Sequence, residues 1–311
     1  MKKIKMMMAA ALGVLVSCGS VKSGEEAIAA SRESKVVVAY VTSWSEVMPD
    51  PQYMTHINYA FGHVNESFNG VKIDNEERLR QIVDLRKQKP ELKVLLSIGG
   101  WGSGRFSEMA ANDEYRRAFA KDCDRVVKEF DLDGIDIDWE YPTSSMANIS
   151  ASPDDTENFT LLMKDIRAAI GDQKELTLAT VASAKYIDFK AILPFINFVN
   201  IMAYDMASAP KHHSALYPSG HSGDITSDGA VTAHLKAGVP PSKLVMGMPF
   251  YGRGGDGYPS FQDYNKVGNT DTQYTEKWDE VAQVPYLADK NDTLVFGFEN
   301  PRSLAIKCQY I

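Results

Sequence analysis

Three carboxylates alternate with apolar residues in one short segment of the chain. Asp136, Asp138 and Glu140 are separated by Ile137 and Trp139. Side chains of a β-strand alternate between its two faces, so the three acids are expected to share one face and the apolar residues the other. Neighbouring buried carboxylates raise one another's pKa, because like charges resist joint ionisation. Such a cluster can keep Glu140 protonated near neutral pH, which is the state that an acid catalyst requires.

Short apolar runs rich in β-branched residues alternate with amphipathic segments along the chain. Strands are expected at 36–44, 56–64, 93–101, 134–141, 176–183, 198–206 and 243–251. Helices are expected at 76–89, 113–130, 155–170 and 226–237. Nearly continuous apolar strands indicate a parallel sheet buried on both faces, which argues against the alternative that the acids lie on a solvated edge strand. Seven strand–helix units favour an α/β fold of the (β/α)8 TIM-barrel class over an open doubly wound sheet.

The segment 133–142, with the sequence DGIDIDWEYP, resembles the DxxDxDxE signature of glycoside hydrolase family 18, the chitinases and their relatives. Further segments follow the order of that family: AY at 39–40, NYAF at 58–61, SIGGW at 97–101, MAYD at 202–205 and GMPFYGR at 247–253. The resemblance extends from about residue 35 to the end of the chain. It implies a TIM barrel with its active site at the C-terminal ends of the strands.

The resemblance also implies a retaining, substrate-assisted hydrolysis of β-1,4-linked N-acetylglucosamine glycans, that is, chitin or chito-oligosaccharides. Glu140 would protonate the glycosidic oxygen and later activate water. Asp138 would bind the N–H of the sugar's acetamido group, with Asp136 behind it. Tyr204 would hold the acetamido oxygen in line for attack on the anomeric carbon. No cofactor and no metal are expected.

Substrate-binding residues are inferred from the same resemblance and from the stacking of pyranose faces on flat aromatic rings. They are Tyr40, Phe61, Trp101, Met202, Asp205, Tyr251 and Arg253. Trp44 is a further aromatic candidate, for which core packing is the alternative. Asp133 and Gly134 open the acidic motif and are expected to be structural.

Other functions remain open at this stage. The chain could be a non-catalytic chitin- or glycan-binding protein, or an endo-β-N-acetylglucosaminidase that acts on N-glycans. A metal-dependent barrel enzyme could use the acid cluster as ligands. His212, His213 and His221 do not have the spacing of zinc ligands and are expected in a solvated loop. The net charge of −8 argues against a nucleic-acid partner, which would require clustered Lys and Arg.

The N-terminus resembles a bacterial lipoprotein signal peptide over residues 1–18. Lys2, Lys3 and Lys5 precede a short apolar run, which ends in LVSC with Cys18 as the lipidated residue. Residues 19–34 are expected to be a flexible tether, and residues 35–311 the catalytic barrel. We therefore expect an exported lipoprotein of the cell envelope, periplasmic or at the cell surface. It would contact the membrane only through its lipid anchor and would be a monomer.

The last part of the chain departs from the family pattern, which normally ends in an eighth strand. Asn300 and Pro301 instead start a helix that continues to the final residue. We therefore expect a barrel without its eighth strand, which leaves the edges of two strands unpaired. A truncated gene and a natural shortened form both explain this pattern. Cys123 and Cys308 are expected to be buried packing residues, or alternatively bridged to each other.

Overall fold

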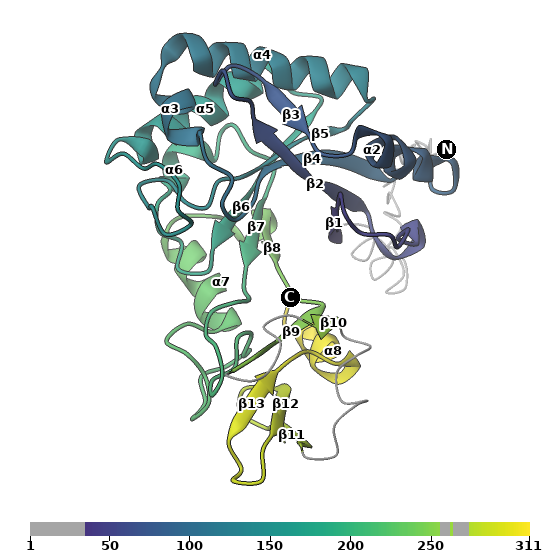
Figure 1. Cartoon of the computed structure of the whole chain (residues 1–311), viewed down its shortest axis with the longest axis vertical. Coiled ribbons are helices and arrows are strands. Elements are labelled where there is room, and N and C mark those ends of the chain that lie inside the picture. The colour runs from purple at the N-terminus through teal and green to yellow at the C-terminus, as the bar shows by residue number, and fades with distance from the viewer. Residues whose placement is uncertain (1–34, 256–261, 264–273) are drawn as a thin grey trace, which may run out of the picture. The chain divides into compact units, whose positions relative to one another are not determined.

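Seven parallel strands form the main sheet in the described part of the protein (Figure 1). In chain order they are β1 (Val38–Thr42), β2 (His56–Val64), β4 (Lys93–Gly99), β5 (Gly134–Asp138), β6 (Glu175–Val181), β7 (Val199–Met202) and β8 (Leu244–Met246). The same order holds across the sheet, and β3 (Val71–Ile73) is added antiparallel to β2. These strands belong to one compact unit of residues 37–311.

The computed structural model describes residues 35–255, 262–263 and 274–311. The predicted signal peptide, the tether and Cys18 lie outside these residues. Within the described ranges, no strand joins the outer edge of β1 to that of β8. The α/β TIM-barrel fold predicted from the sequence is therefore confirmed in the form of an open barrel of parallel strands.

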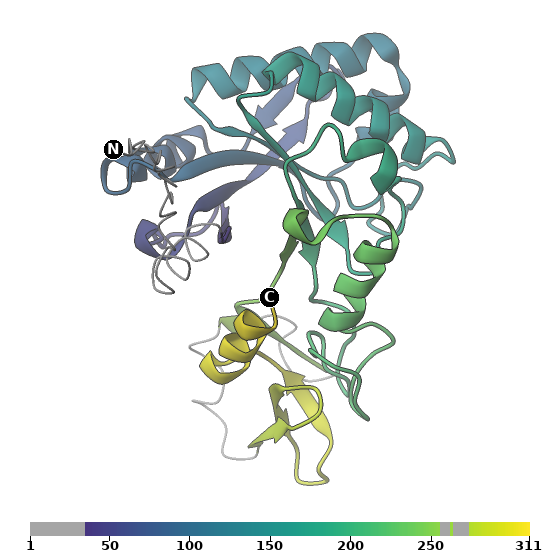
Figure 2. The same ribbon diagram turned by 180° about the vertical axis from the view of Figure 1, so that it is seen from behind.

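Helices follow the strands and cover the sheet. They are α2 (Glu76–Val83), α3 (Phe106–Ala111), α4 (Asp113–Glu129), α5 (Asp155–Ile170), α6 (Phe189–Ile192) and α7 (Ser227–Lys236), with short 3-10 turns η1 (Pro51–Tyr53), η2 (Asp84–Lys87) and η3 (Pro241–Lys243). The long helices α4 and α5 lie against each other, as the reverse view shows (Figure 2). The predicted helices are confirmed, with ends that differ by a few residues.

The amphipathic pattern of α4 explains why it forms and where it packs. Asn112 caps its first turn by accepting hydrogen bonds from two backbone N–H groups, those of Glu114 and Tyr115. Phe119, Cys123 and their neighbours at helical spacing are buried, while the opposite face carries charged residues. Packing of this apolar face against the barrel fixes the helix behind the central strands.

A second, antiparallel sheet follows the barrel. Its strands are β9 (Tyr251–Gly254), β10 (Gln262–Asp263), β11 (Thr275–Asp279), β12 (Val284–Ala288) and β13 (Leu294–Gly297), in the order β10-β9-β13-β12-β11. The extent of the strand expected at 243–251 was therefore wrong. Only β8 belongs to the barrel, because it ends at Met246 and β9, which begins at Tyr251, pairs with β10 and β13 instead.

Helix α8 (Pro301–Tyr310) ends the chain and confirms the predicted helix start at Asn300. The side chain of Asn300 accepts a hydrogen bond from the backbone N–H of Ser303, and the Ser303 hydroxyl accepts one from the backbone N–H of Asn300. Cys308 on this helix is exposed and Cys123 is buried, and both are free thiols. The expectation that Cys308 is buried was wrong, and so was the alternative of a bridge.

A fully buried ion pair fastens α8 to the rest of the protein. The Lys307 ammonium donates to Glu299 and to the backbone carbonyl of Ser214. The Ser214 hydroxyl donates to the same Glu299 oxygen at 2.7 Å. Lys307 is 0% exposed and Glu299 1%. Burial lowers the pKa of Lys307, although the charge of Glu299 opposes this effect.

His212 and His213 are buried, so the expectation of a solvated loop was wrong for both. Nε2 of His212 lies 3.2 Å from an oxygen of Asp279, the last residue of β11. Burial is the main cause that lowers the pKa of His212 to about 4. The segment around these histidines is covered by the second sheet, which the sequence did not predict. In the part of the chain that the structure describes, no helix is both long and apolar enough to cross a bilayer.

Candidate active site

Strand β5 places two of the three acids in the middle of the parallel sheet. Asp136 is 0% exposed and Asp138 is 5% exposed, and Ile135 and Ile137, which alternate with them along the strand, are fully buried. Glu140 follows two residues after the end of β5 and is partly buried. The acids therefore follow one another towards the C-terminal end of the strand, which is where barrel enzymes carry their active sites.

Four donors from four other strands surround the Asp136 carboxyl. One oxygen accepts from the Tyr40 hydroxyl at 2.9 Å and from the Ser97 hydroxyl at 2.8 Å. The other accepts from the Thr177 hydroxyl at 2.6 Å and from the Asn200 amide at 3.2 Å. Burial raises the pKa of Asp136, and these hydrogen bonds oppose the rise. The network fixes the side chain in the centre of the barrel and presents it to Asp138.

Asp138 combines deep burial with an unused hydrogen-bonding atom. Its Oδ1 has no hydrogen-bond partner among the described residues. Burial is the first cause that raises its pKa well above the ordinary value, followed by the charges of Glu140 and Asp136. A buried polar atom without a partner is costly, so a donor supplied by a ligand would be favoured at this position.

Glu140 has the electrostatic setting of an acid that remains protonated close to neutral pH. Burial raises its pKa to about 7, and the charge of Asp205 adds to this rise. A hydrogen bond with Tyr141 lowers the pKa in part. The preceding Trp139 packs its ring on Phe106, with centroids 5.3 Å apart, and so anchors the backbone beside the acid.

Tyr204 and Asp205 come from the C-terminal end of β7, together with Met202. The phenol ring of Tyr204 contacts Tyr251, with centroids 6.1 Å apart. Burial is the main cause that raises the pKa of Tyr204, followed by the charge of Asp138, so its hydroxyl stays a donor. Asp205 forms an ion pair with Arg253, with Nε and Oδ1 2.6 Å apart. Two substrate-binding candidates from β9, Tyr251 and Arg253, are thus brought to the segment that follows β7 and carries Tyr204.

Aromatic side chains surround the strand ends. Trp44 is 69% exposed and Trp101 61% exposed, so core packing is excluded for Trp44. Phe61 lies between them in sequence and contacts Trp44, with ring centroids 6.5 Å apart. Trp101 meets the edge of Tyr141 at 6.4 Å, and Tyr141 stacks on Tyr186 at 5.5 Å. Exposed flat rings next to polar groups suit the binding of a sugar chain.

Asp133 and Gly134 lie at the opposite, N-terminal end of β5. Asp133 accepts a hydrogen bond from the backbone of Val94 at 2.7 Å and pairs with Arg86. A side chain at Gly134 would collide with the backbone of Glu175, since a Cβ atom would lie 2.0 Å from its carbonyl oxygen. Both residues therefore hold β5 in the sheet, away from the acids.

Several residues of the site were missed by sequence reasoning. Thr177 and Asn200 each place a polar side chain in an otherwise apolar, buried strand, and that contrast is a signal which could have found them. Ser97 lies in the segment 97–101, which was noted only because it follows the family's order of segments. Tyr141 follows Glu140 directly. Tyr186 has no comparable signal, because only the fold brings it to Tyr141.

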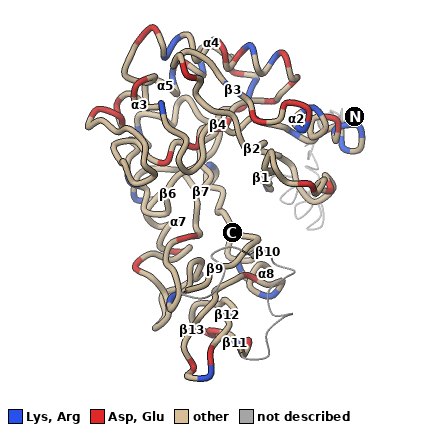
Figure 3. The backbone as a smooth tube through the Cα atoms, in the orientation of Figure 1, with Lys and Arg blue, Asp and Glu red and all other residues tan. Residues whose placement is uncertain are grey.

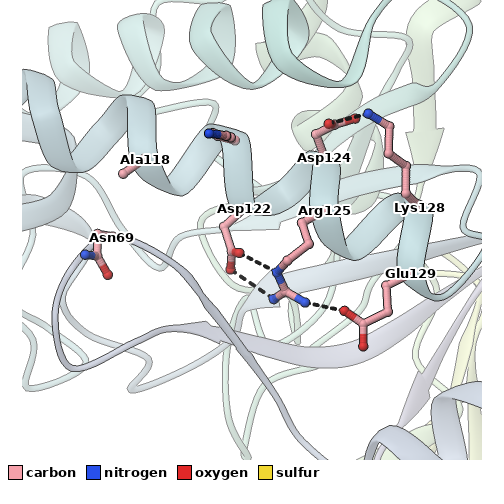
Figure 4. A pocket seen from close by; sticks show the side chains of 8 residues that line it. Asn69, Ala118, Asp122, Asp124, Arg125, Lys128 and Glu129 are labelled. Carbon is pink, nitrogen blue, oxygen red and sulfur yellow. Dashed lines mark hydrogen bonds and ion pairs between the residues drawn. The ribbon is translucent and has the colours of Figure 1, made fainter.

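A surface pocket of about 680 Å³ lies elsewhere, against α4 (Figure 4). Its lining is Asn69, Ala118, Lys121, Asp122, Asp124, Arg125, Lys128 and Glu129. Acidic and basic residues are interspersed along this helix (Figure 3). Arg125 pairs with Asp122 at 2.6 Å and also with Glu129, and Lys128 pairs with Asp124 at 2.6 Å. These charges are paired with one another, and the strand ends that carry the buried acids do not line the pocket. In the ranges that the structure describes, no three His, Cys, Asp or Glu side chains are arranged to hold a metal ion.

Comparisons of sequence find chitinases. Chitinase A1 of Niallia circulans is 28% identical over 394 residues, which cover 92% of this chain and 56% of that protein. Mouse chitotriosidase-1 is 33% identical over 251 residues, which cover 70% of this chain and 53% of that protein. The match thus spans little more than half the length of these two relatives.

Solved structures of similar fold point to the same family. A glycoside hydrolase family 18 N-acetylglucosaminidase from Paenibacillus barengoltzii is 33% identical with a TM-score of 0.81, over 88% of this chain and 91% of that one. The chitinase domain of a spore coat protein from Clostridium difficile is 34% identical with a TM-score of 0.72, over 89% and 83%. The model of the glycosyl hydrolases family 18 matches residues 36–311. The chain therefore belongs to glycosyl hydrolases family 18.

Proposed function

We propose that the protein is a retaining endo-hydrolase of β-1,4-linked N-acetylglucosamine glycans, with chitin or chito-oligosaccharides as substrate. The observation that carries this proposal is the row of acids on and after β5. It has Glu140 at its outer end and, next to it, Asp138 with a buried oxygen that lacks a partner. The chitinases among the relatives support the choice of substrate.

The first step breaks the glycosidic bond. The protonated Glu140 donates its proton to the glycosidic oxygen, and the bond from that oxygen to the anomeric carbon breaks. The acetamido carbonyl oxygen of the same sugar forms the new bond to the anomeric carbon, which gives an oxazolinium ion. Asp138 accepts a hydrogen bond from the acetamido N–H and stabilises the positive charge of the oxazolinium ion. The Tyr204 hydroxyl donates a hydrogen bond to the acetamido oxygen.

The second step restores the enzyme. The Glu140 carboxylate takes a proton from a water molecule as the water oxygen attacks the anomeric carbon, and the oxazolinium ring reopens. Two inversions at one carbon give net retention of configuration. The buried network around Asp136 holds this second carboxyl behind Asp138. The two carboxyls can therefore share a proton as the charge on the substrate changes.

The test of this function is the release of a fluorophore from an aryl glycoside of chitobiose by residues 19–311. The anomeric configuration of the first product would be read by proton NMR. Release with retained configuration supports the proposal. An N-glycopeptide and the aryl glycoside of a single N-acetylglucosamine would be assayed beside it. Cleavage of the glycopeptide alone would favour an endo-β-N-acetylglucosaminidase, and turnover of none of the three would favour a sugar-binding protein.

The value of kcat/KM is expected to fall as the pH rises through about 7. Glu140 must carry a proton in the first step, and its pKa is raised to about 7. Asp205→Asn removes a charge that raises this pKa, so the fall should move to lower pH. The measurement is kcat/KM between about pH 4 and 9 for both proteins. Rates that stay constant across the whole alkaline side would contradict the assignment of the acid.

Trp101→Ala is expected to raise KM roughly three- to tenfold with a smaller change in kcat, because a stacking surface for the sugar is lost. Tyr53→Ala is the matched control, since Tyr53 is also an exposed aromatic residue, 80% accessible, but lies in η1 before β2. Steady-state kinetics on chitotetraose distinguish the two variants. Equal effects of both substitutions would argue against Trp101 as a sugar platform.

We propose further that the protein is exported and anchored by a lipid on Cys18, which the signal-like residues 1–18 support. Cells that express the full chain should incorporate labelled palmitate into the protein and retain it in the membrane fraction. Cys18→Ala should abolish the label and release the protein from that fraction. Label in the Cys18→Ala protein would contradict the assignment of the lipid site.

A further inference from the structure

A chain of three polar side chains, from the end of β2, the residue after β3 and the turn that follows β4, lies outside the acid cluster. The Ser103 hydroxyl is 2.8 Å from Nδ1 of His63, and Nε2 of His63 is 3.0 Å from an oxygen of Asp74. Ser103 and the His63 side chain are partly buried, while the Asp74 side chain is 40% exposed. The proposed reaction assigns no role to any of these residues.

For a neutral His63 ring, hydrogen-bonding rules fix the direction of this chain. A carboxylate oxygen only accepts, so Nε2 of His63 donates to Asp74. Nδ1 of the neutral ring is then an acceptor, and the Ser103 hydroxyl donates its proton to it. The lone pairs of the Ser103 oxygen remain available, so Ser103 can accept a hydrogen bond from a ligand.

The position of Ser103 ties it to the catalytic strand. The backbone N–H of Gly100 donates to the carbonyl oxygen of Asp138 at 2.9 Å, and the N–H of Ser103 donates to the carbonyl of Gly100 at 3.0 Å. Gly100 has a φ of +92°, and a Cβ atom there would lie 2.8 Å from the Phe61 ring. Two successive backbone hydrogen bonds thus connect Ser103 through Gly100 to Asp138 of β5. The Phe61 ring lies against the same tight turn.

Aromatic residues adjoin the polar chain in β2 and in the turn after β4. His63 is two residues after Phe61, and their rings contact with centroids 6.4 Å apart. Ser103 is two residues after the exposed Trp101. Flat rings that flank an oriented acceptor match the chemistry of a sugar, which offers an apolar ring face and hydroxyl or amide donors at its edge.

The same three residue types form the triad of serine hydrolases, but the geometry disfavours that role. In such enzymes the N–H of the nucleophilic serine helps to bind the oxyanion. Here the N–H of Ser103 is already bonded to the carbonyl of Gly100. A binding role uses the observed contacts without breaking any of them.

We propose that Ser103, oriented by His63 and Asp74, is a specificity-determining contact for an N-acetylglucosamine unit bound beyond the unit at Glu140. Its oxygen accepts a hydrogen bond from a hydroxyl or acetamido N–H of that unit. The inference takes the identity of the ligand from the proposed function. It predicts that the binding of longer sugar chains depends on Ser103 more strongly than the binding of shorter ones.

The test is calorimetric binding of chitobiose and chitotetraose to the Glu140→Gln protein, with and without Ser103→Ala. The ratio of the tetraose affinity to the biose affinity should fall about tenfold in the double variant, as expected for one lost hydrogen bond. His63→Phe keeps a ring against Phe61 but removes both nitrogens, and it should lower the same ratio. Ser150→Ala, which removes a surface hydroxyl bonded to Glu108 at 2.8 Å, should leave the ratio unchanged.

An unchanged ratio in Ser103→Ala would overturn the inference, whether both affinities stay the same or both fall by the same factor. Hydrolysis of the chitobiose glycoside by the wild-type chain is measured in parallel. Turnover with an unchanged ratio overturns only the role of Ser103. A reduced ratio without wild-type turnover supports the role of Ser103 and contradicts only the hydrolase.

Discussion

Glu140→Gln is expected to reduce kcat by a factor of about 10² to 10⁴ while the protein remains folded. Gln has nearly the same shape as Glu, but its amide has no acidic proton for the glycosidic oxygen and is too weak a base to take one from water. Both chemical steps therefore slow. Substrate binding should persist, because the aromatic residues around the strand ends and the oxygens of Asp138 are unchanged.

The measurement is kcat and KM on the chitobiose glycoside, together with the midpoint of thermal unfolding. Glu108→Gln is the matched control, since Glu108 is an exposed carboxylate of α3 that accepts a hydrogen bond from the neighbouring loop. It should retain full activity. If Glu140→Gln keeps more than about a tenth of the wild-type kcat, another group supplies the proton and the proposed mechanism is wrong.

The arrangement of the acids on β5 could be predicted because it depends only on local geometry. A strand buried on both faces alternates its side chains, so the spacing of Asp136, Asp138 and Glu140 is enough to place the first two on one face. The partners of Asp136 could not be predicted in this way. Tyr40 and Thr177 reach it from β1 and β6, and those contacts exist only when the register of the whole sheet is known.

The second sheet could not be predicted because its effects are non-local. The polar composition around His212 is typical of a solvated loop, yet Asp279, 67 residues later in the sequence, covers that side chain. The segment 243–251 was predicted as one strand because its apolar residues are continuous. The structure divides it into β8, which ends at Met246, and β9, which begins at Tyr251; Pro249, which has no N–H for a ladder, lies between them.

The second sheet also contributes residues to the candidate site. The stability of that sheet is therefore expected to affect activity. Arg253 and Tyr251 belong to β9, and both are placed next to Asp205 at the end of β7. His213 adds a contact with Asp205 at 3.4 Å. The next residue, Ser214, bonds to the buried ion pair of α8. Loosening α8 would thus affect residues that surround Glu140 and Tyr204.

Lys307→Met is accordingly expected to lower the free energy of unfolding by about 3 to 5 kcal/mol. The substitution leaves Glu299 as a buried carboxylate without its ammonium partner, and Oε2 of Glu299 already has no hydrogen-bond partner among the described residues. The carbonyl of Ser214 loses its donor as well. A buried charge that loses its partner costs far more than the pair contributes, since its desolvation is no longer compensated.

Urea unfolding followed by circular dichroism measures this loss. Lys277→Met is the matched control, because Lys277 forms an exposed ion pair with Asp292 in the same C-terminal region and its removal should have no measurable effect. Lys307→Met combined with Glu299→Leu should recover much of the stability, since both charges are then absent from the interior. If Lys307→Met were no more destabilising than Lys277→Met, water would have to reach Glu299, and α8 would not be the fixed support that positions Asp205 through Ser214 and His213.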